Sequence, residues 1–245
     1  MKLFKTKKSY IRSGLLYGIT DIHSHLLPGV DDGIDTYDES VKVLHWLKDK
    51  GIRRIYLTPH VMSDLQKNTR AYLTEQFNAF TKRLEDEQVE DIPELKLGSE
   101  YMLEAAFEEH KKEGLITYAD RQVLVETSYM FPPIDFMRLL INLQEDGYSP
   151  VLAHPERYRY MEERDYTYLK KQNISFQLNI FSLAGAYGNY AKEKAEKLLK
   201  CGYYNYAGSD FHCLKRHENS FSVKILTKKQ QVALKELFDN NNRLW

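Results

Sequence analysis

The stretch "DIHSHLLPGVDDG", residues 21–33, decides how this chain combines its fold with its chemistry. It ends a β-rich run and places His23 and His25 one residue apart, so both imidazoles leave a strand on the same face. The acidic pair Asp31 and Asp32 and then Gly33 follow. Alone, the stretch is explained either by a metal site or by a polar strand end before an ordinary turn. The rest of the sequence distinguishes the two.

The chain on both sides of this stretch alternates short β-rich runs with helical patterns. Strands are expected at residues 15–23, 52–60, 94–100, 121–128, 149–156, 174–180 and 203–210. Helices are expected at residues 36–51, 68–88, 102–114, 134–147, 162–172, 189–202 and 227–241. Strands that alternate with helices predict parallel pairing through right-handed crossovers. The length and regularity of the pattern favour a closed (β/α) barrel over an open doubly wound sheet.

Composition and charge narrow the class of protein. The 245 residues suit one domain, expected at residues 19–245 after an extension at residues 1–18 to which we assign no function. The formal net charge is zero, so bulk attraction to nucleic acid is not indicated. No apolar run predicts membrane insertion or a secretory signal. Cys201 and Cys213 are the only cysteines, which indicates a reducing cytoplasm.

Histidines and carboxylates recur where the expected strands end. These positions are His23 and His25, His60, Glu100, Glu126, His154, and Asp210 with His212. The carboxyl ends of barrel strands converge on one mouth, so the pattern favours a metal site over isolated strand caps. Imidazole and carboxylate ligands without thiolate suit manganese, iron or zinc. Because the set exceeds the needs of one ion, we expect two or three clustered ions that act on a phosphoryl group.

Arg157 lies three residues after His154, at the same mouth, where it is expected to bind phosphate oxygens. A surface ion pair with Glu156 or Glu162 is the alternative. Lys215 and Arg216, shortly after His212, are weaker candidates for the same role. Three other histidines stand apart from the pattern. His45 and His110 are expected in helices as structural or exposed residues, and His217 in a loop with no assigned role.

With these residues in place, the chain resembles the PHP (polymerase and histidinol phosphatase) superfamily, and within it the bacterial capsular or exopolysaccharide protein-tyrosine phosphatases. The segments that carry the resemblance are "DIHSHLLPGVDDG", "LTPH", "LGSE", "LVETS", "LAHPERY" and "GSDFH", which together span residues 21–212. The resemblance implies a distorted (β/α)7 TIM-like barrel that holds three metal ions, often manganese.

The resemblance also implies three groups of metal ligands. The first ion is held by His23, His25, Glu100 and Asp210, the second by Glu100, Glu126 and His154, and the third by Asp32, His60 and His212. Arg157 matches an arginine implicated in phosphate binding and catalysis. Arg216 lies near the place of a second such arginine, but its surroundings do not align with the family pattern. Asp31 is then expected to be a turn residue or a partner of a ligand.

The activity implied by the resemblance is metal-dependent hydrolysis of phosphotyrosine. The substrate would be the tail of a bacterial tyrosine kinase that controls polysaccharide synthesis and export. The sequence offers an independent check, because cysteine-based tyrosine phosphatases need Cys-x5-Arg and the residues six positions after the two cysteines are Ala207 and Asn219. Three alternatives stay open: a small-molecule phosphoesterase such as histidinol-phosphate phosphatase, a non-catalytic kinase-binding module, and a nuclease-like or polymerase-associated domain. The zero net charge weighs against the last.

Overall fold

The computed structural model describes residues 6–119 and 121–245, and its strands all pair in parallel. The strands are β1 (Thr20–Asp21), β2 (Arg54–Leu57), β3 (His60–Val61), β4 (Glu94–Leu97), β5 (Glu100–Met102), β6 (Gln122–Glu126), β7 (Ser149–Ala153), β8 (Ser175–Asn179) and β9 (Tyr206–Gly208). They form two sheets, in the orders β1-β2-β4 and β3-β5-β6-β7-β8-β9.

The two sheets continue into each other. The strands β2 and β3 belong to one extended segment interrupted at residues 58–59, and β4 and β5 to a second segment interrupted at residues 98–99. Backbone hydrogen bonds cross both interruptions, from Gly98 to Leu57 at 2.8 Å and from Glu100 to Pro59 at 3.1 Å. The chain therefore has seven successive strand segments, as the alternating pattern predicts.

The first and last of these segments also meet. Just beyond β1 and β9, Ser24 and Phe211 form a parallel bridge. The Asp210 amide donates to the His23 carbonyl at 2.8 Å, and the His25 amide donates to the Phe211 carbonyl at 2.9 Å. The first and last strand segments are thus hydrogen-bonded to each other, so the row of strands curves round on itself. The parallel α/β, TIM-barrel-like fold expected from the sequence is confirmed.

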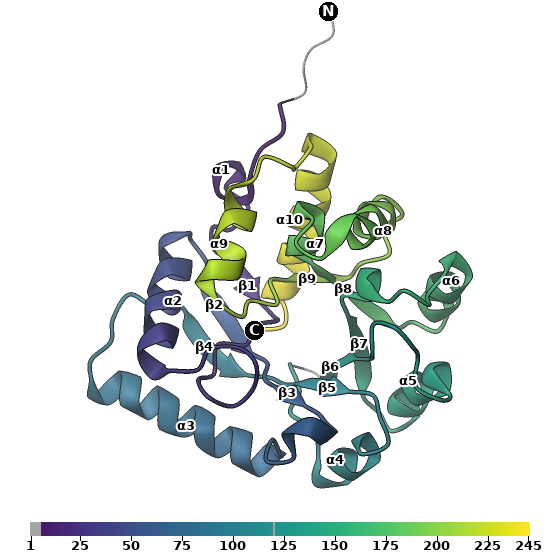
Figure 1. Cartoon of the computed structure of the whole chain (residues 1–245), viewed down its shortest axis with the longest axis horizontal. Helices are drawn as coiled ribbons and strands as arrows, with labels where there is room; N and C mark the ends of the chain where they lie inside the picture. The colour runs from purple at the N-terminus through teal and green to yellow at the C-terminus, as the bar shows by residue number, and fades with distance from the viewer. Residues whose placement is uncertain (1–5, 120) are drawn as a thin grey trace, which may run out of the picture.

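Helices surround the strands (Figure 1). They are α1 (Tyr10–Ser13), α2 (Tyr37–Asp49), α3 (Arg70–Asp86), α4 (Phe107–Glu113), α5 (Phe136–Glu145), α6 (Glu163–Lys171), α7 (Ile180–Ala184), α8 (Gly188–Lys200), α9 (Leu214–Ser222) and α10 (Lys228–Asn242), with short 3-10 turns η1 (Ser63–Leu65) and η2 (Pro155–Arg157). Thr36 caps α2, since its hydroxyl accepts from the Glu39 amide. Because the strands are parallel, each helical connection between two strands returns the chain to the same end of the strands.

The expected strand at residues 15–23 is wrong over most of its length. Only Thr20 and Asp21 are in β1, and α1 precedes them. Gly14 and Gly18 have φ of 75° and 76°, a left-handed conformation that ends α1 and turns the chain before β1. The apolar "LLY" between the two glycines is therefore a turn rather than a strand, although Leu16 is buried.

The helix α9 replaces the loop expected around His217. Its buried positions include His217, Ser220 and Phe221, so one helical face points into the protein. The His217 ring stacks on Phe181, with centroids 4.5 Å apart and planes 13° apart. Burial lowers the pKa of His217 to about 3, so this ring is neutral and acts as part of the core. Because His217 and Ser220 on the buried face of α9 are polar, the apolar residues of this segment do not show a helical period.

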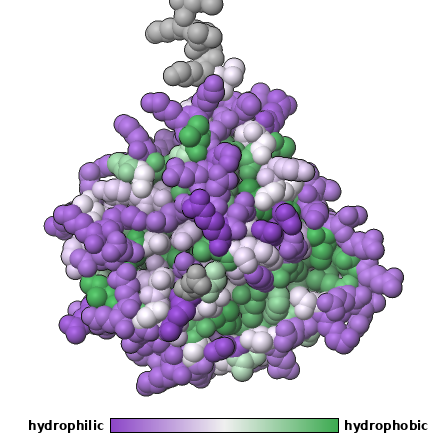
Figure 2. All heavy atoms as spheres, turned by 180° about the vertical axis from the view of Figure 1, so that it is seen from behind, coloured by the Kyte–Doolittle hydropathy of each residue, from purple (hydrophilic) through white to green (hydrophobic). Residues whose placement is uncertain are grey.

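Apolar side chains fill the space between strands and helices in one large cluster. The residues described before position 19 pack against it, because Tyr10 is fully buried and its hydroxyl donates to the Ile180 carbonyl at 2.8 Å. Seen from behind, most of the surface is hydrophilic, with hydrophobic residues showing between the polar ones (Figure 2). Within residues 6–119 and 121–245, no helix has the length and apolar character needed to cross a bilayer.

Candidate metal centre

Strand pairing brings the expected ligands side by side. In the parallel register His60 lies opposite Glu100, and Glu126 lies opposite Met102, two residues further along the same strand. The hydrogen bonds between the first and last strand segments bring His23 and Asp210 together in the same way. Glycine permits these close approaches. A Cβ at position 208 would lie 2.6 Å from the Cβ of His23, and one at position 33 only 2.1 Å from the His25 carbonyl oxygen.

The first group expected from the resemblance is assembled at the centre of the site. His23 Nε2 lies 3.2 Å from His25 Nε2 and 3.1 Å from Glu100 Oε2. Asp210 Oδ1 lies 3.4 Å from His23 Nε2 and 3.3 Å from His25 Nε2. All four side chains are buried. Four ligand atoms therefore face one another across a space suited to a single cation.

The second group differs from the expectation in one ligand. Glu100 and Glu126 lie together, and His154 Nε2 is 3.0 Å from Glu100 and 3.8 Å from Glu126. His60 also reaches both carboxylates, with Nδ1 at 3.2 Å from Glu100 Oε2 and 3.1 Å from Glu126 Oε1, and it is closer to Glu126 than His154 is. The carboxylate pair therefore has two imidazoles beside it, and only His154 was assigned to it from the sequence.

The third group opens to the surface. Asp32 Oδ1 lies 3.4 Å from His60 Nε2 and 3.5 Å from His212 Nε2. His25 lies between these two imidazoles, with ring centroids 4.4 Å from His60 and 4.2 Å from His212. The Asp32 side chain is 69 % exposed, whereas the side chains of the first group are buried. Solvent thus reaches the site at this third group.

Acceptor groups outside the three clusters orient the imidazoles. His23 Nδ1 lies 3.0 Å from Gln177 Oε1, and His25 Nδ1 lies 2.8 Å from Asp31 Oδ2. Because amide and carboxylate oxygens only accept, each Nδ1 donates its proton to them, and each Nε2 is the nitrogen left to face the cluster. Asp31 is thus a partner of a ligand, as the sequence analysis expected. Gln177 was missed, and its only signal was a polar residue between the apolar residues Phe176 and Leu178 of β8.

Replacing Gln177 with leucine removes the acceptor that fixes the His23 ring. The volume is nearly kept, but the imidazole loses its preference for the tautomer that presents Nε2. We expect Mn²⁺ affinity to fall about 10–100-fold, the usual effect of removing such a partner. Titration of the metal-free protein with Mn²⁺ measures this change, with thermal melting as the control for folding. Unchanged affinity in a folded variant would contradict the role given to Gln177.

The residues present fit divalent cations. His60 Nδ1, His154 Nδ1 and Glu100 Oε2 are buried and have no hydrogen-bond partner within the described residues. Such atoms are costly to leave unpaired in a protein interior. Burial raises the pKa of Glu100, but the imidazoles of His23 and His154 outweigh it and hold this pKa well below its ordinary value. The buried carboxylate is therefore ionised and available to a cation.

Metal binding is expected to release protons. Burial lowers the pKa of His60, but the carboxylates of Asp32 and Glu126 outweigh burial and raise it to about 10. The metal-free ring is therefore protonated near pH 7, and it must lose that proton to become a ligand. Affinity for Mn²⁺ should rise with pH up to this pKa. Calorimetric titrations in two buffers of different ionisation enthalpy test this, and equal heats in both buffers would contradict it.

Arg157 lies at the edge of the first group. Its Nη1 donates to Asp210 Oδ2 at 2.7 Å and its Nη2 donates to the Tyr129 hydroxyl at 2.6 Å. Its guanidinium sits between two rings, 4.2 Å from the centroid of Tyr129 and 4.1 Å from that of Tyr187. The alternative of a surface ion pair with Glu156 or Glu162 is wrong, because the ion pair is with Asp210 and the side chain is only 12 % exposed.

Other residues near Arg157 complete its setting. Asn179, at the end of β8, donates through Nδ2 to Asp210 Oδ2 at 2.9 Å and so shares this carboxylate with Arg157. Arg216 lies 5.5 Å from the centroid of the Tyr187 ring, and its side chain is exposed. Tyr129 and Tyr187, which enclose the Arg157 guanidinium, were missed from the sequence, where 18 tyrosines gave no reason to select them.

Two of the remaining histidines lie outside these clusters, as expected. His45 is half-buried in α2, and His110 in α4 lies against Tyr101 with ring centroids 6.4 Å apart. Neither belongs to the three groups of ligand atoms found in the described part of the chain. The site therefore draws on the histidines at strand ends.

Imidazoles and carboxylates grouped at the carboxyl ends of parallel strands, beside an arginine, define a metal-dependent hydrolase of the TIM-barrel-like kind. The chain belongs to the capsular polysaccharide synthesis family CpsB/CapC, which matches residues 19–244. The resemblance described above is thereby confirmed.

Known relatives align with most of this chain. Tyrosine-protein phosphatase YwqE of Bacillus subtilis (strain 168) is 32 % identical over 200 residues, which cover 80 % of this chain and 78 % of the relative. Tyrosine-protein phosphatase CpsB of Streptococcus pneumoniae is 28 % identical over 235 residues, or 91 % and 96 % of the two chains. A solved structure from a study of YwqE and CpsB, described as unique metal-dependent tyrosine phosphatases, superposes with a TM-score of 0.75 at 27 % identity and covers 92 % of this chain and 91 % of its own.

Proposed function

We propose that this chain is a metal-dependent protein-tyrosine phosphatase that hydrolyses phosphotyrosine. One observation carries the proposal: three groups of imidazole and carboxylate atoms lie at one mouth, beside an arginine, and any two groups have one residue in common. The common residues are Glu100, His25 and His60. Clustered divalent ions next to an arginine suit the transfer of a phosphoryl group to water. The named relatives, which are tyrosine-protein phosphatases, support the same reaction.

The ligands proposed for the metal ions are those expected from the sequence. They are His23, His25, Asp32, His60, Glu100, Glu126, His154, Asp210 and His212. When bound, the ions supply activation of water and neutralisation of phosphate charge. Two or three ions are proposed, with Mn²⁺ first and Fe or Zn as alternatives, because the ligand types do not separate these metals.

The protein's own groups position the substrate. Arg157 uses one N–H on each terminal nitrogen for Asp210 and Tyr129, and we propose that its outer N–H groups bind two phosphate oxygens. The flanking rings of Tyr129 and Tyr187 hold the guanidinium group between them. Its hydrogen bond to Asp210 prevents the group from rotating away from the proposed phosphate site. Arg216, which is exposed beyond Tyr187, is proposed as a second and more mobile contact to phosphate.

A protein substrate is favoured by the exposure of the third group. Because the Asp32 side chain is 69 % exposed, the site meets solvent at an open rim and not at the end of a deep pocket. We therefore propose a polypeptide substrate, the phosphotyrosine tail of a bacterial tyrosine kinase that controls capsular or exopolysaccharide synthesis. A cytoplasmic location is proposed with it, supported by two cysteines that both are free thiols.

The test compares a phosphotyrosine peptide with histidinol phosphate, each with Mn²⁺ and with an excess of chelator. Hydrolysis of the peptide that depends on Mn²⁺ is the expected result. Hydrolysis of histidinol phosphate alone would replace the proposal with a small-molecule phosphoesterase. Peptide binding without any hydrolysis would replace it with a kinase-binding module. Activity that persists after complete metal removal would exclude the role given to the metal centre.

A further inference from the structure

Large apolar side chains gather on residues 129–134, the loop between β6 and α5, which we name the 129–134 loop. Met130 is 51 % exposed, Phe131 73 % and Ile134 91 %. Within the described residues, ten large apolar side chains are at least 39 % exposed, and four of them belong to this loop. Apolar area left in water is unfavourable. A concentration of it in one loop therefore indicates a contact surface.

The first residue of the loop is part of the candidate active site. The Tyr129 hydroxyl accepts a hydrogen bond from Arg157 Nη2 at 2.6 Å, and its ring lies 5.9 Å from the ring of His154. The Tyr129 carbonyl also accepts from the Arg159 amide at 2.9 Å. The loop thus begins beside the proposed phosphate-binding arginine and leads away from it over the surface.

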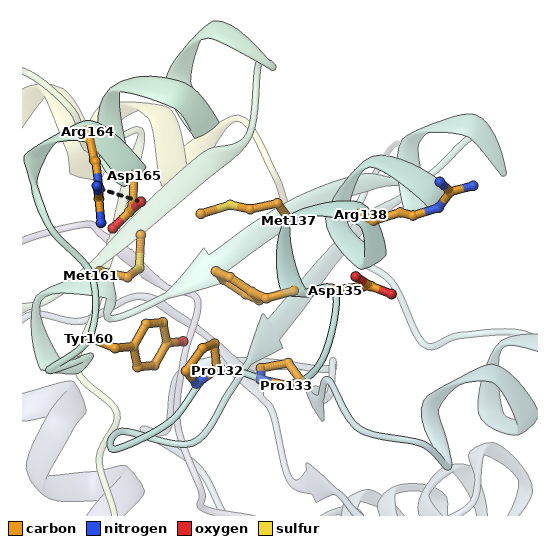
Figure 3. A pocket seen from close by; sticks show the side chains of 10 residues that line it. Pro132, Pro133, Asp135, Met137, Arg138, Tyr160, Met161, Arg164 and Asp165 are labelled. Atoms are coloured by element: carbon orange, nitrogen blue, oxygen red, sulfur yellow. Dashed lines mark ion pairs between the residues drawn. The ribbon is translucent and has the colours of Figure 1, made fainter.

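The other end of the loop borders a cavity of about 540 Å³ (Figure 3). Pro132 and Pro133 line it from the loop, and Tyr160 and Met161 line it from the segment that follows η2. A series of aromatic rings connects this cavity to the site. The ring of Tyr158 is 6.3 Å from that of Tyr129 and 5.8 Å from that of Tyr160, and it is nearly parallel to both.

The loop is built to keep its apolar side chains outward. Two successive prolines fix φ near −65°, which restricts the conformations available to the segment between β6 and α5. Phe131 and Ile134 are therefore held in solvent with less freedom to fold back on the core. The loop therefore loses less conformational entropy when a partner binds than a flexible loop would.

We propose that the 129–134 loop binds the polypeptide that flanks the substrate phosphotyrosine, and that it selects apolar side chains there. This inference rests on the proposed function. A phosphoryl group on Arg157 places the substrate tyrosyl ring beside Tyr129, so the adjoining backbone must pass over the loop. The cavity accepts the next side chain. Its rim carries Arg138, Arg164, Asp135 and Asp165, two charges of each sign, so the selection depends on apolar contact and not on charge.

The experiment compares three substrates on four proteins with Mn²⁺ bound. The substrates are a phosphotyrosine peptide with leucines on both sides, the same peptide with serines, and p-nitrophenyl phosphate. The proteins are wild type, Phe131→Ser, Ile134→Ser and the control Val232→Ser, which removes an apolar side chain that is 69 % exposed on α10. In both loop variants we expect kcat/KM for the leucine peptide to fall about tenfold through KM. Hydrolysis of p-nitrophenyl phosphate should be unchanged, and the control should match wild type throughout.

Each other outcome overturns the inference. An equal loss on all three substrates would mean that the loop supports the site and does not recognise the peptide. An equal preference for leucine and serine peptides in wild type would exclude apolar selection. A wild-type dimer that becomes a monomer in the loop variants, with unchanged kinetics, would assign the surface to a second copy of this chain. Wild type that hydrolyses no substrate with Mn²⁺ would instead refute the proposed function itself.

Discussion

We expect phosphatase activity to fall about 10³-fold when Glu100 is replaced with glutamine. Glu100 Oε2 lies within 3.4 Å of His23, His25 and His60, so this oxygen belongs to two of the three ligand groups. An amide keeps the shape but removes the charge that would attract cations to this position. Metal ions contribute several kcal/mol to such reactions, and each 1.36 kcal/mol is a factor of ten in rate. Steady-state kinetics with saturating Mn²⁺ measure the loss.

The control for this experiment is Glu94→Gln, in β4 of the same strand segment. Glu94 is half-exposed and forms surface ion pairs with Arg53 and Arg54, which are of small energetic weight. Activity and melting temperature should stay close to wild type. Titration of Glu100→Gln with Mn²⁺ should show weaker binding. A folded Glu100→Gln protein with wild-type kinetics would refute the assignment of Glu100 as the shared ligand.

Replacing Arg157 should lower kcat/KM by about 10² to 10³-fold, with alanine more damaging than lysine. Lysine keeps the positive charge but lacks the planar pair of N–H donors and does not stack between Tyr129 and Tyr187 in the same way. Metal affinity should be little changed, because Arg157 contacts Oδ2 of Asp210, whereas the Oδ1 atom faces the proposed ligands His23 and His25. Kinetics on a phosphotyrosine peptide and Mn²⁺ titration separate the two effects.

The matched control is Arg159→Lys, two residues further along, where the side chain is exposed. It should retain wild-type kinetics. Loss of metal binding in Arg157→Ala, in parallel with loss of activity, would assign this arginine to support of the metal centre. Unchanged hydrolysis in both Arg157 variants would remove it from the proposed mechanism.

The convergence of the site was predictable because strand ends in a parallel barrel meet at one mouth. His23, His60 and Asp210 stand far apart in the sequence, yet their positions after β-rich runs were enough to place them together. The resemblance then separated them into groups. The position of His60 next to Glu126 was not predictable, because sequence does not say which ring nitrogen faces which neighbour.

Other features depend on tertiary contacts that leave weak local patterns. The helix α9 was not predicted, because its buried face includes polar residues. One of them, His217, packs in the core by stacking on Phe181. Glycines 14 and 18 decided the start of β1 through their backbone conformation, against the apolar letters between them. Gln177 and Tyr129 act through single contacts to His23 and Arg157, which no spacing rule describes.

The hydrogen bonds between the first and last strand segments have a consequence for how the protein is made. His23 and His25 come from the start of the chain and Asp210 and His212 from near its end, yet they complete the same ligand groups. During synthesis the ribosome releases the first histidines long before their partners exist. The emerging chain can therefore hold only an incomplete set of ligands, and a high-affinity centre forms only when the last strand has docked beside the first. Cation binding by these residues would thus report completion of the fold, and it would link the last strand segment to the first.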